Sequence, residues 1–275
     1  MRDWPVKAAD TEQQRASRAS MQVIYGLNPV LEGLRSGAGV IKTIFLSSNR
    51  HGPRVEEITK LAREQKIPVT CREGAFMDRL AAGNRHQGVL ALFGDFTYHS
   101  LDSIIQNSKA DLAGGPLLVL DSITDPQNLG SLVRSAHCFG VSAVIIPRDR
   151  AAGVTPAVIR ASAGSVLHTP VCRVVNIART IEQLKEAGYW IFGADASAEN
   201  DCRELEYEPP SALVLGSEGT GLRALVRRKC DYLVRIPMKG VVDSLNVAVA
   251  GGILLYEITR VAAGKPSRAG TARKS

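Results

Sequence analysis

The feature that most constrains the fold is the alternation of short apolar runs with amphipathic helical segments in the second half of the chain. Residues 116–122 (PLLVLDS) form an apolar run that ends in turn-forming residues, as expected for a buried parallel strand. Residues 129–139 then place apolar side chains on one helical face, and Gly140 stands where a helix commonly ends. Because strands separated by helices form parallel sheets, this pattern predicts an open parallel sheet with helices on both faces.

The alternation continues through the rest of this region. Further apolar runs are predicted to be strands, at residues 141–147, 168–174, 189–195, 212–218 and 232–238. Helices are predicted to begin at Thr155-Pro156, to cover 177–187, and to close the region over 244–262. Either Asp243 or Ser244 is expected to cap the closing helix.

The first half shows a weaker alternation of the same kind. Helices are predicted at 28–36, 55–66 and around 76–81, with strands at 41–47, 67–71 and 88–93. A helix that Ser100 can cap then runs to about residue 109, where the sequence ADLAGG breaks it. We therefore expect a mobile N-terminal arm, a small α/β domain, a linker, a larger α/β domain and a basic tail, over residues 1–20, 21–97, 98–115, 116–263 and 264–275.

Composition excludes several classes of protein. A hydrophobic content of 45% and a charged content of 22% exclude a largely disordered chain, a collagen and a coiled-coil rod. No apolar stretch is long enough for a transmembrane helix, and the first twenty residues contain no apolar signal segment. The five cysteines are widely spaced, so we expect buried thiols in a reducing cytoplasm rather than disulfides or a metal site. A cytoplasmic protein is expected.

The positive charge is unevenly distributed along the chain. The formal net charge is +7, and the basic excess lies in residues 21–110 and in the last seventeen residues, which carry no acidic side chain. This distribution suits a polyanionic partner such as RNA. A solvated basic tail that aids solubility explains the end of the chain equally well.

Three predicted strand ends in the second half are rich in glycine and polar side chains, over residues 121–134, 215–222 and 235–255. Ligands bind beyond the carboxyl ends of the strands in open parallel sheets, so these segments predict one binding site. Taken singly, each could be an ordinary tight turn or a capped helix, and Asn128 is expected to cap the helix after the first strand. Neither a dinucleotide fingerprint nor an NTP phosphate loop is present.

These segments resemble, in order and spacing, the signature motifs of the SPOUT superfamily of RNA methyltransferases, TrmH (SpoU) branch. The matching residues are Asp125, Pro126, Asn128, Gly130 and Arg134, then 215–219, then 236–238 and 244–247. In the first half, residues 25–30 and 85–89 look like the substrate-binding domain of family members that modify large-subunit ribosomal RNA. That domain is similar to a small ribosomal-protein fold that binds RNA.

The resemblance implies an S-adenosyl-L-methionine (SAM)-dependent ribose 2′-O-methyltransferase, a deep trefoil knot in the second domain and a homodimer, with no metal and no membrane partner. From the positions that match the family motifs, the residues expected to hold SAM are Leu215, Gly216, Ile236, Pro237, Met238, Ser244 and Leu245. The expected catalytic residues are Asn128, Arg134, Glu218, Ser244 and Asn246. The residues expected to bind RNA are Asn28, Arg85, His86 and Arg134, although His86 could equally stabilise a turn.

The implied substrate is a guanosine of 23S ribosomal RNA. Family analogy assigns Arg134 to activation of the ribose hydroxyl, but the pKa of an arginine, about 12.5–13.8, makes it a poor base. We therefore expect Arg134 to orient the RNA phosphate and to stabilise the developing oxyanion. The alternatives are a tRNA ribose methyltransferase, a catalytically silent RNA-binding or ribosome-assembly protein, and a nicotinamide-dependent oxidoreductase. The last fits the predicted sheet, but this sequence lacks the glycine fingerprint of such enzymes.

Overall fold

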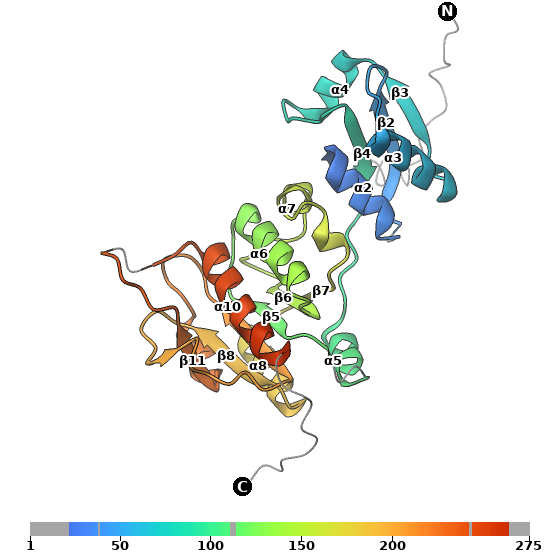
Figure 1. Cartoon of the computed structure of the whole chain (residues 1–275). Coiled ribbons are helices and arrows are strands. Elements are labelled where there is room, and N and C mark those ends of the chain that lie inside the picture. The colour runs from blue at the N-terminus through green and yellow to red at the C-terminus, as the bar shows by residue number, and fades with distance from the viewer. Residues whose placement is uncertain (1–21, 38, 111–113, 242–243, 264–275) are drawn as a thin grey trace, which may run out of the picture. The chain divides into compact units, whose positions relative to one another are not determined.

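The computed structural model describes residues 22–37, 39–110, 114–241 and 244–263 (Figure 1). The chain divides into two compact units, Met1–Thr97 and Tyr98–Ser275. The predicted N-terminal arm and basic tail, 1–20 and 264–275, lie outside the described residues. Within the described ranges, no helix has both the length and the apolar composition needed to cross a bilayer.

The first unit is a four-stranded sheet with helices. The strands are β1 (Gln22–Tyr25), β2 (Ile41–Ser47), β3 (Val69–Arg72) and β4 (Val89–Phe93), and the helices are α2 (Leu27–Arg35), α3 (Pro53–Glu64) and α4 (Gly74–Ala81). The strand order is β1-β4-β2-β3, with β2 and β3 parallel and the other pairs antiparallel. The six predicted elements are confirmed. Strand β1 was not predicted, because a four-residue edge strand is defined by its pairing with β4 rather than by a periodic pattern of its own.

The second unit is built on a parallel sheet with the strand order β7-β6-β5-β10-β8-β11-β9. Its strands are β5 (Leu117–Leu120), β6 (Ala143–Pro147), β7 (Val171–Val174), β8 (Trp190–Ala194), β9 (Asn200–Asp201), β10 (Ser211–Leu215) and β11 (Tyr232–Arg235). Its helices are α5 (Leu101–Ala110), α6 (Pro126–Cys138), α7 (Pro156–Ala161), the 3-10 helix η1 (Ser165–Leu167), α8 (Ile177–Glu186), α9 (Ala224–Lys229) and α10 (Val247–Ala263).

Helices cover both faces of this sheet. The face that carries Leu117 and Val214 packs against α5, α8 and α9 in one buried cluster. Successive strand residues point to opposite faces, so Leu215 lies on the other face, where α10 approaches so closely that a Cβ at Gly251 would be 2.8 Å from Leu215 Cδ1. Helix α10 packs in turn against α6, and α6 against α7 (Figure 1). The predicted fold class is therefore confirmed, whereas the trefoil knot stays a prediction.

Several predicted boundaries in this unit differ from the structure. The strand predicted over 232–238 ends at Arg235, and the helix predicted to begin at residue 244 begins at Val247. The two-residue strand β9 and the short helix α9 were not predicted, because segments of two and six residues are too short to display a period. By contrast, Thr155 caps α7 with Pro156 at its first position, and Gly140 follows α6 with φ +70°, as predicted.

The segment predicted as a linker, 98–115, is largely structured where it is described. Ser100 Oγ accepts a hydrogen bond from Ser103 N, at 3.2 Å, and caps α5 as expected. His99 forms an isolated parallel β-bridge with Cys172 of β7, and Ile104 of α5 is buried in the core of the second unit. These contacts attach residues 98–110 to the second unit.

The five cysteines are free thiols, and their burial differs. Cys172 and Cys202 are buried and Cys230 is partly buried, but Cys71 and Cys138 are exposed. The expectation of buried thiols is therefore wrong for the last two. Burial raises the pKa of Cys172 to about 11 and that of Cys230 to about 12, so both thiols remain protonated at neutral pH.

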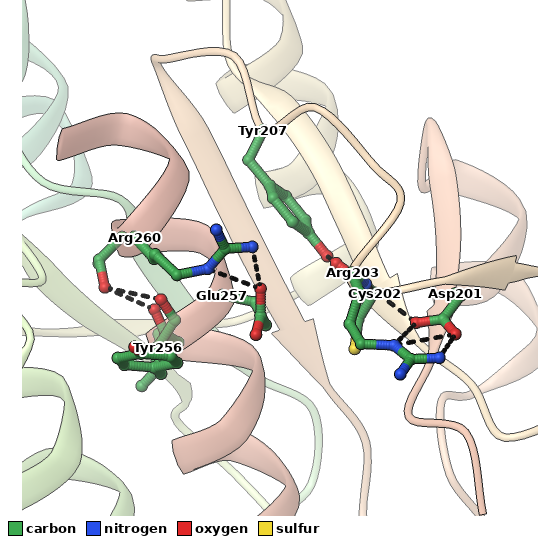
Figure 2. Close-up of polar contacts among 9 residues, drawn as sticks. Asp201, Cys202, Arg203, Tyr207, Tyr256, Glu257 and Arg260 are labelled. Atoms are coloured by element: carbon green, nitrogen blue, oxygen red, sulfur yellow. Dashed lines mark hydrogen bonds and ion pairs between the residues drawn. The ribbon is translucent and has the colours of Figure 1, made fainter. Parts of the chain in front are cut away.

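Two groups of polar residues, one near β9 and one on α10, each form hydrogen bonds and ion pairs within the group (Figure 2). The Tyr207 hydroxyl donates to the carbonyl of Cys202 at 2.7 Å, and Arg203 forms an ion pair with Asp201. The hydrogen bonds from Arg203 lower the pKa of Asp201 to about 2, so its carboxylate stays ionised. On α10, Arg260 pairs with Glu257 one turn earlier. These hydrogen bonds and ion pairs are local, and none of them involves the polar segments predicted to form the binding site.

Two helix glycines provide a matched test of this packing. A Cβ at Gly130 would lie 2.4 Å from Ala161 Cβ and 3.0 Å from the Ser162 backbone nitrogen, whereas at Gly252 the nearest atom would be 3.7 Å away. We expect Gly130→Ala to lower the free energy of unfolding by about 1–3 kcal/mol, because α6 and α7 must move apart. Gly252→Ala should raise it by about 0.5–1 kcal/mol, because alanine favours a helix. Urea unfolding measures both, and equal effects would contradict the close packing of α6 on α7.

Candidate active site

The three polar segments predicted to form a site meet through their side chains. Asn128, in the first turn of α6, donates from Nδ2 to Glu218 Oε1 at 2.8 Å. Asn246, immediately before α10, donates from Nδ2 to the same oxygen at 2.7 Å and to Asn128 Oδ1 at 3.0 Å. Asn128, Glu218 and Asn246 thus form one hydrogen-bonded triad, which we call the amide–carboxylate triad. In sequence, Asn128 is separated from Glu218 by 90 positions and from Asn246 by 118. The predicted convergence of the three strand ends is confirmed.

Asn246 has a second role that the sequence analysis assigned to its neighbours. Its Oδ1 accepts hydrogen bonds from the backbone nitrogens of Ala248 and Val249, at 3.0 and 3.4 Å, and so caps α10. The expectation that Ser244 forms this cap is wrong, and Asp243 lies outside the described residues. Because the helix occupies the amide oxygen, the amide NH₂ group is oriented toward Glu218.

Asn128 is free for the triad because Asp125 caps α6 in its place. The Asp125 carboxylate accepts from Gln127 N at 3.0 Å, and Pro126 occupies the first helical turn. Proline is favoured at the first helical position, so the cap falls on the residue before it. Asn128 therefore lies inside the helix, 8% exposed, and the prediction that it caps α6 is wrong.

The segment between β10 and α9 folds back on itself at glycine positions. Ser217 and Gly221 exchange two backbone hydrogen bonds, at 3.0 and 3.1 Å. A Cβ at Gly216 would lie 2.0 Å from the carbonyl carbon of Gly221, so only glycine fits there. Gly219 and Gly221 have φ angles of +85° and +64°, which glycine adopts without strain. This glycine loop, residues 216–221, carries Glu218 at its tip.

An ion pair between a buried carboxylate and an exposed arginine anchors the glycine loop to the sheet. Asp121, fully buried at the end of β5, accepts from Arg223 Nε at 2.7 Å and from Arg223 N at 3.1 Å. Its own backbone nitrogen donates to the carbonyl of Leu215 at 2.7 Å. Neither residue was predicted from the sequence. The sequence did contain a signal for Asp121, because its carboxylate directly follows four apolar residues of a predicted buried strand. A charge in such a position requires a partner of opposite charge.

A cavity of about 600 Å³ opens beside the triad. Six of the seven residues predicted to hold SAM line it, namely Leu215, Gly216, Ile236, Met238, Ser244 and Leu245. Glu218 and Asn246 line it as well. Ile236 and Met238 are free to do so because β11 ends at Arg235 and the chain continues as a loop. The cavity combines apolar side chains with the backbone of the glycine loop, a combination typical of sites for cofactor-sized molecules.

The end of β8 contributes an acidic residue to this cavity that was not predicted. Asp195 lines it and pairs with Arg227. Burial alone would raise the pKa of Asp195, but hydrogen bonds from Arg227 and Ser197 outweigh it, so the pKa lies below its ordinary value. Asp195 therefore stays ionised and is a weak proton acceptor. Among the described residues, no group of three or more His, Cys, Asp or Glu side chains could hold a metal ion.

Arg134 does not join the other predicted catalytic residues within its own chain. It lies on the exposed side of α6, and Leu132 and Val133 next to it are buried. Its guanidinium group makes no hydrogen bond or ion pair with any residue that the structure describes.

In the first unit, the residues predicted to bind RNA have different surroundings. His86 accepts a hydrogen bond at Nδ1 from Gly88 N, at 3.0 Å, and its Nε2 lies 3.0 Å from an Asp78 carboxylate oxygen. His86 thus takes the position of a turn-stabilising residue. Arg85 is exposed in the same loop, and Asn28 Oδ1 accepts from Arg54 at 2.9 Å.

Comparison with known proteins supports the fold and the enzyme class. Residues 115–256 match the SpoU rRNA Methylase family, and residues 23–99 match the family described as RNA 2′-O ribose methyltransferase substrate binding. A Bacillus subtilis (strain 168) protein, YacO, whose name places it in the TrmH family of tRNA/rRNA methyltransferases, is 40% identical over 237 residues. The match covers 86% of this chain and 94% of YacO.

Two solved structures are similar over nearly the whole chain. The AdoMet-bound rRNA methyltransferase of Sinorhizobium meliloti has a TM-score of 0.72 and 28% identity, covering 91% of each chain. The SpoU methyltransferase AviRb of Streptomyces viridochromogenes, in complex with AdoMet, has a TM-score of 0.75 and 26% identity, covering 93% of this chain and 95% of that one. The enzyme class and cofactor expected from the sequence agree with these findings. The chain therefore belongs to the SpoU methylase family of RNA 2′-O-ribose methyltransferases.

Proposed function

We propose that this protein transfers a methyl group from SAM to the ribose 2′-hydroxyl of a guanosine in 23S ribosomal RNA. The observation that carries the proposal is the amide–carboxylate triad beside a cavity of about 600 Å³. Bound SAM supplies an electrophilic methyl group on its sulfonium. Leu215, Ile236 and Leu245 give the cavity apolar walls for such a molecule, and the glycine loop adds backbone donors and acceptors.

The triad positions the groups around the reacting oxygen. One oxygen of Glu218 accepts both amide donors, which fixes the side chains of Asn128 and Asn246 relative to each other. Ser244 also lines the cavity and is assigned a binding role there. Attack on the methyl group needs the ribose oxygen in line with it, so rigid side chains at this edge favour the reactive geometry.

Arg134 acts on the RNA in this proposal. Its exposed guanidinium is suited to hold a phosphate beside the target ribose and to stabilise negative charge that develops on the 2′-oxygen. Arginine stays protonated at neutral pH, so another acceptor receives the proton from the hydroxyl.

The first unit supports ribosomal RNA as the substrate. Residues 23–99 match the substrate-binding family, and the S. meliloti rRNA methyltransferase covers both units of this chain. A tRNA substrate remains the second candidate, since the name of YacO includes both RNA classes. A silent RNA-binding protein is disfavoured because Asn128, Glu218 and Asn246 are present and hydrogen-bonded. A ribosomal RNA substrate also implies action in the cytoplasm.

A homodimer forms part of the proposal. Val249, Ile253 and Tyr256 lie on one face of α10 and are 51%, 38% and 52% exposed. The Tyr256 ring packs edge-on against Phe139, the residue that follows α6, which extends this apolar face to the end of that helix. Apolar side chains at i, i+4 and i+7 form a continuous stripe, and a two-fold axis would bury the stripe of one chain against that of another.

The proposal is tested by methyl transfer from labelled SAM to unmodified 23S ribosomal RNA and, in parallel, to bulk tRNA. Because 2′-O-methylation blocks alkaline cleavage of the adjacent phosphodiester, we expect label at one alkali-resistant guanosine of the ribosomal RNA. Label in tRNA alone would contradict the substrate class. Absence of label in both RNAs, with SAM bound, would contradict the enzymatic function.

The role of Arg134 predicts a graded loss of activity. Arg134→Ala should lower kcat by about 10²–10³-fold with little change in SAM affinity, because a donor that stabilises the transition state is removed. Arg134→Lys should retain an intermediate rate, since lysine keeps the charge but loses the planar fork. Arg179→Ala, an exposed arginine on α8, is the matched control. Wild-type turnover of Arg134→Ala would remove Arg134 from the mechanism.

A further inference from the structure

The first unit contains a cavity whose charged lining is entirely basic. It has a volume of about 500 Å³ and is lined by Leu27, Arg50, Arg54, Arg85 and Gln87. The three arginines come from separate places in the sequence: Arg50 follows β2, Arg54 lies in α3, and Arg85 precedes β4. No carboxylate lines this part of the described structure. We call Arg50, Arg54 and Arg85 the arginine cluster.

Two of the three arginines are held in place by specific contacts. Arg54 donates from its guanidinium to Asn28 Oδ1 at 2.9 Å. The aliphatic part of Arg50 lies over Gly88, where an added Cβ would be 3.1 Å from Arg50 Cβ and Cγ. Gly88 also has a φ of +77°, so glycine is required there both for space and for conformation.

The loop that carries Arg85 is fixed as well. His86 accepts a hydrogen bond from Gly88 N, and Gln87 Oε1 accepts from Leu27 N at 3.4 Å. The loop is thereby tied to the start of α2. These contacts give Asn28 and His86 supporting roles: Asn28 positions Arg54, and His86 shapes the turn beside Arg85.

The charges of the cluster are not neutralised by the protein. The guanidinium groups of Arg50 and Arg85 make no hydrogen bond or ion pair with any described residue. Arg35 of the same unit, in contrast, pairs with Glu32 and Glu57. Three guanidinium groups around one cavity repel one another, and an anion bound between them relieves that repulsion.

The geometry points to the phosphate backbone of RNA as that anion. The guanidinium fork matches two phosphate oxygens, and arginines along one opening can contact successive phosphates of a chain. Resting on the proposed function, we propose that Arg50, Arg54 and Arg85 bind backbone phosphates of the substrate RNA. Phosphate contacts carry no sequence information, so the cluster sets the position of the RNA on the first unit rather than the choice of nucleotide.

The test is RNA binding by the full chain at several salt concentrations, with 23S ribosomal RNA as the probe. Arg50→Ala, Arg54→Ala and Arg85→Ala should each weaken binding about fivefold. Each should also reduce the slope of log affinity against log salt by about 0.7–0.9, because one fewer phosphate is neutralised. SAM affinity should stay at the wild-type value, and the KM for RNA should rise while kcat at saturating RNA is unchanged.

Two matched variants separate charge from folding. Arg79→Ala removes one exposed arginine of the same unit that does not line the cavity, and we expect wild-type RNA affinity and salt slope. Arg54→Lys keeps the charge, so it should retain most of the salt slope that Arg54→Ala loses. Cluster variants that behave like Arg79→Ala would overturn the inference.

Competition with inorganic pyrophosphate distinguishes RNA from a small anion. Displacement of RNA from the wild type, but not from the triple alanine variant, would support the cluster as an RNA phosphate site. Pyrophosphate binding that depends on the cluster while RNA affinity does not would overturn it. The proposed function fails separately: a wild type that binds RNA with a cluster-dependent salt slope but transfers no methyl group would refute the enzyme and support the cluster.

Discussion

A single carboxylate oxygen of Glu218 connects the parts of the candidate active site. It accepts hydrogen bonds from Asn128 on α6 and from Asn246 before α10, while Glu218 itself sits on the glycine loop after β10. Asn246 also caps α10, so the residue that begins the last helix directs its amide toward the carboxylate. Glu218 and Asn246 are exposed, so water can replace a lost partner there, and we expect removal of one hydrogen bond of the triad to cost about 0.5–1.5 kcal/mol.

The sheet determines why these segments can meet. Strands β5 and β10 are neighbours, with Leu120 opposite Leu215, so α6 and the glycine loop start side by side. Asp121 then fixes the far end of that loop through Arg223. Strand β11 lies beyond β8, and the chain after it returns to β10, where α10 packs through Gly251. Close packing at glycine and the ion pair of buried Asp121 with Arg223 therefore hold the loop that lines the cavity.

Sequence patterns predicted the second unit well because its central strands β5, β6 and β10 are buried on both faces and its longer helices carry clear periods. Residues whose role depends on distant partners were harder to assign. Asn128 and Asn246 were both selected, but the caps were misassigned: Asp125, directly before Pro126, caps α6, and Asn246 itself caps α10. Asp121 and Arg223 were missed, as were Arg50 and Arg54, which reach their cavity only through the fold. The knot has no local signature, and it was expected solely from family resemblance.

The central claim is that the amide–carboxylate triad forms the SAM site by linking the three strand ends. The most direct test exchanges the hydrogen-bond donor at Asn246 with the acceptor at Glu218. Asn246→Asp retains the capping oxygen but sets two carboxylates against each other, and Glu218→Gln removes the acceptor charge. We expect each single variant to weaken SAM binding measured by calorimetry, and the double variant to regain part of the loss, because the glutamine amide can donate to the new aspartate. A coupling free energy of about 1–3 kcal/mol is the predicted result. Additive losses would contradict the account.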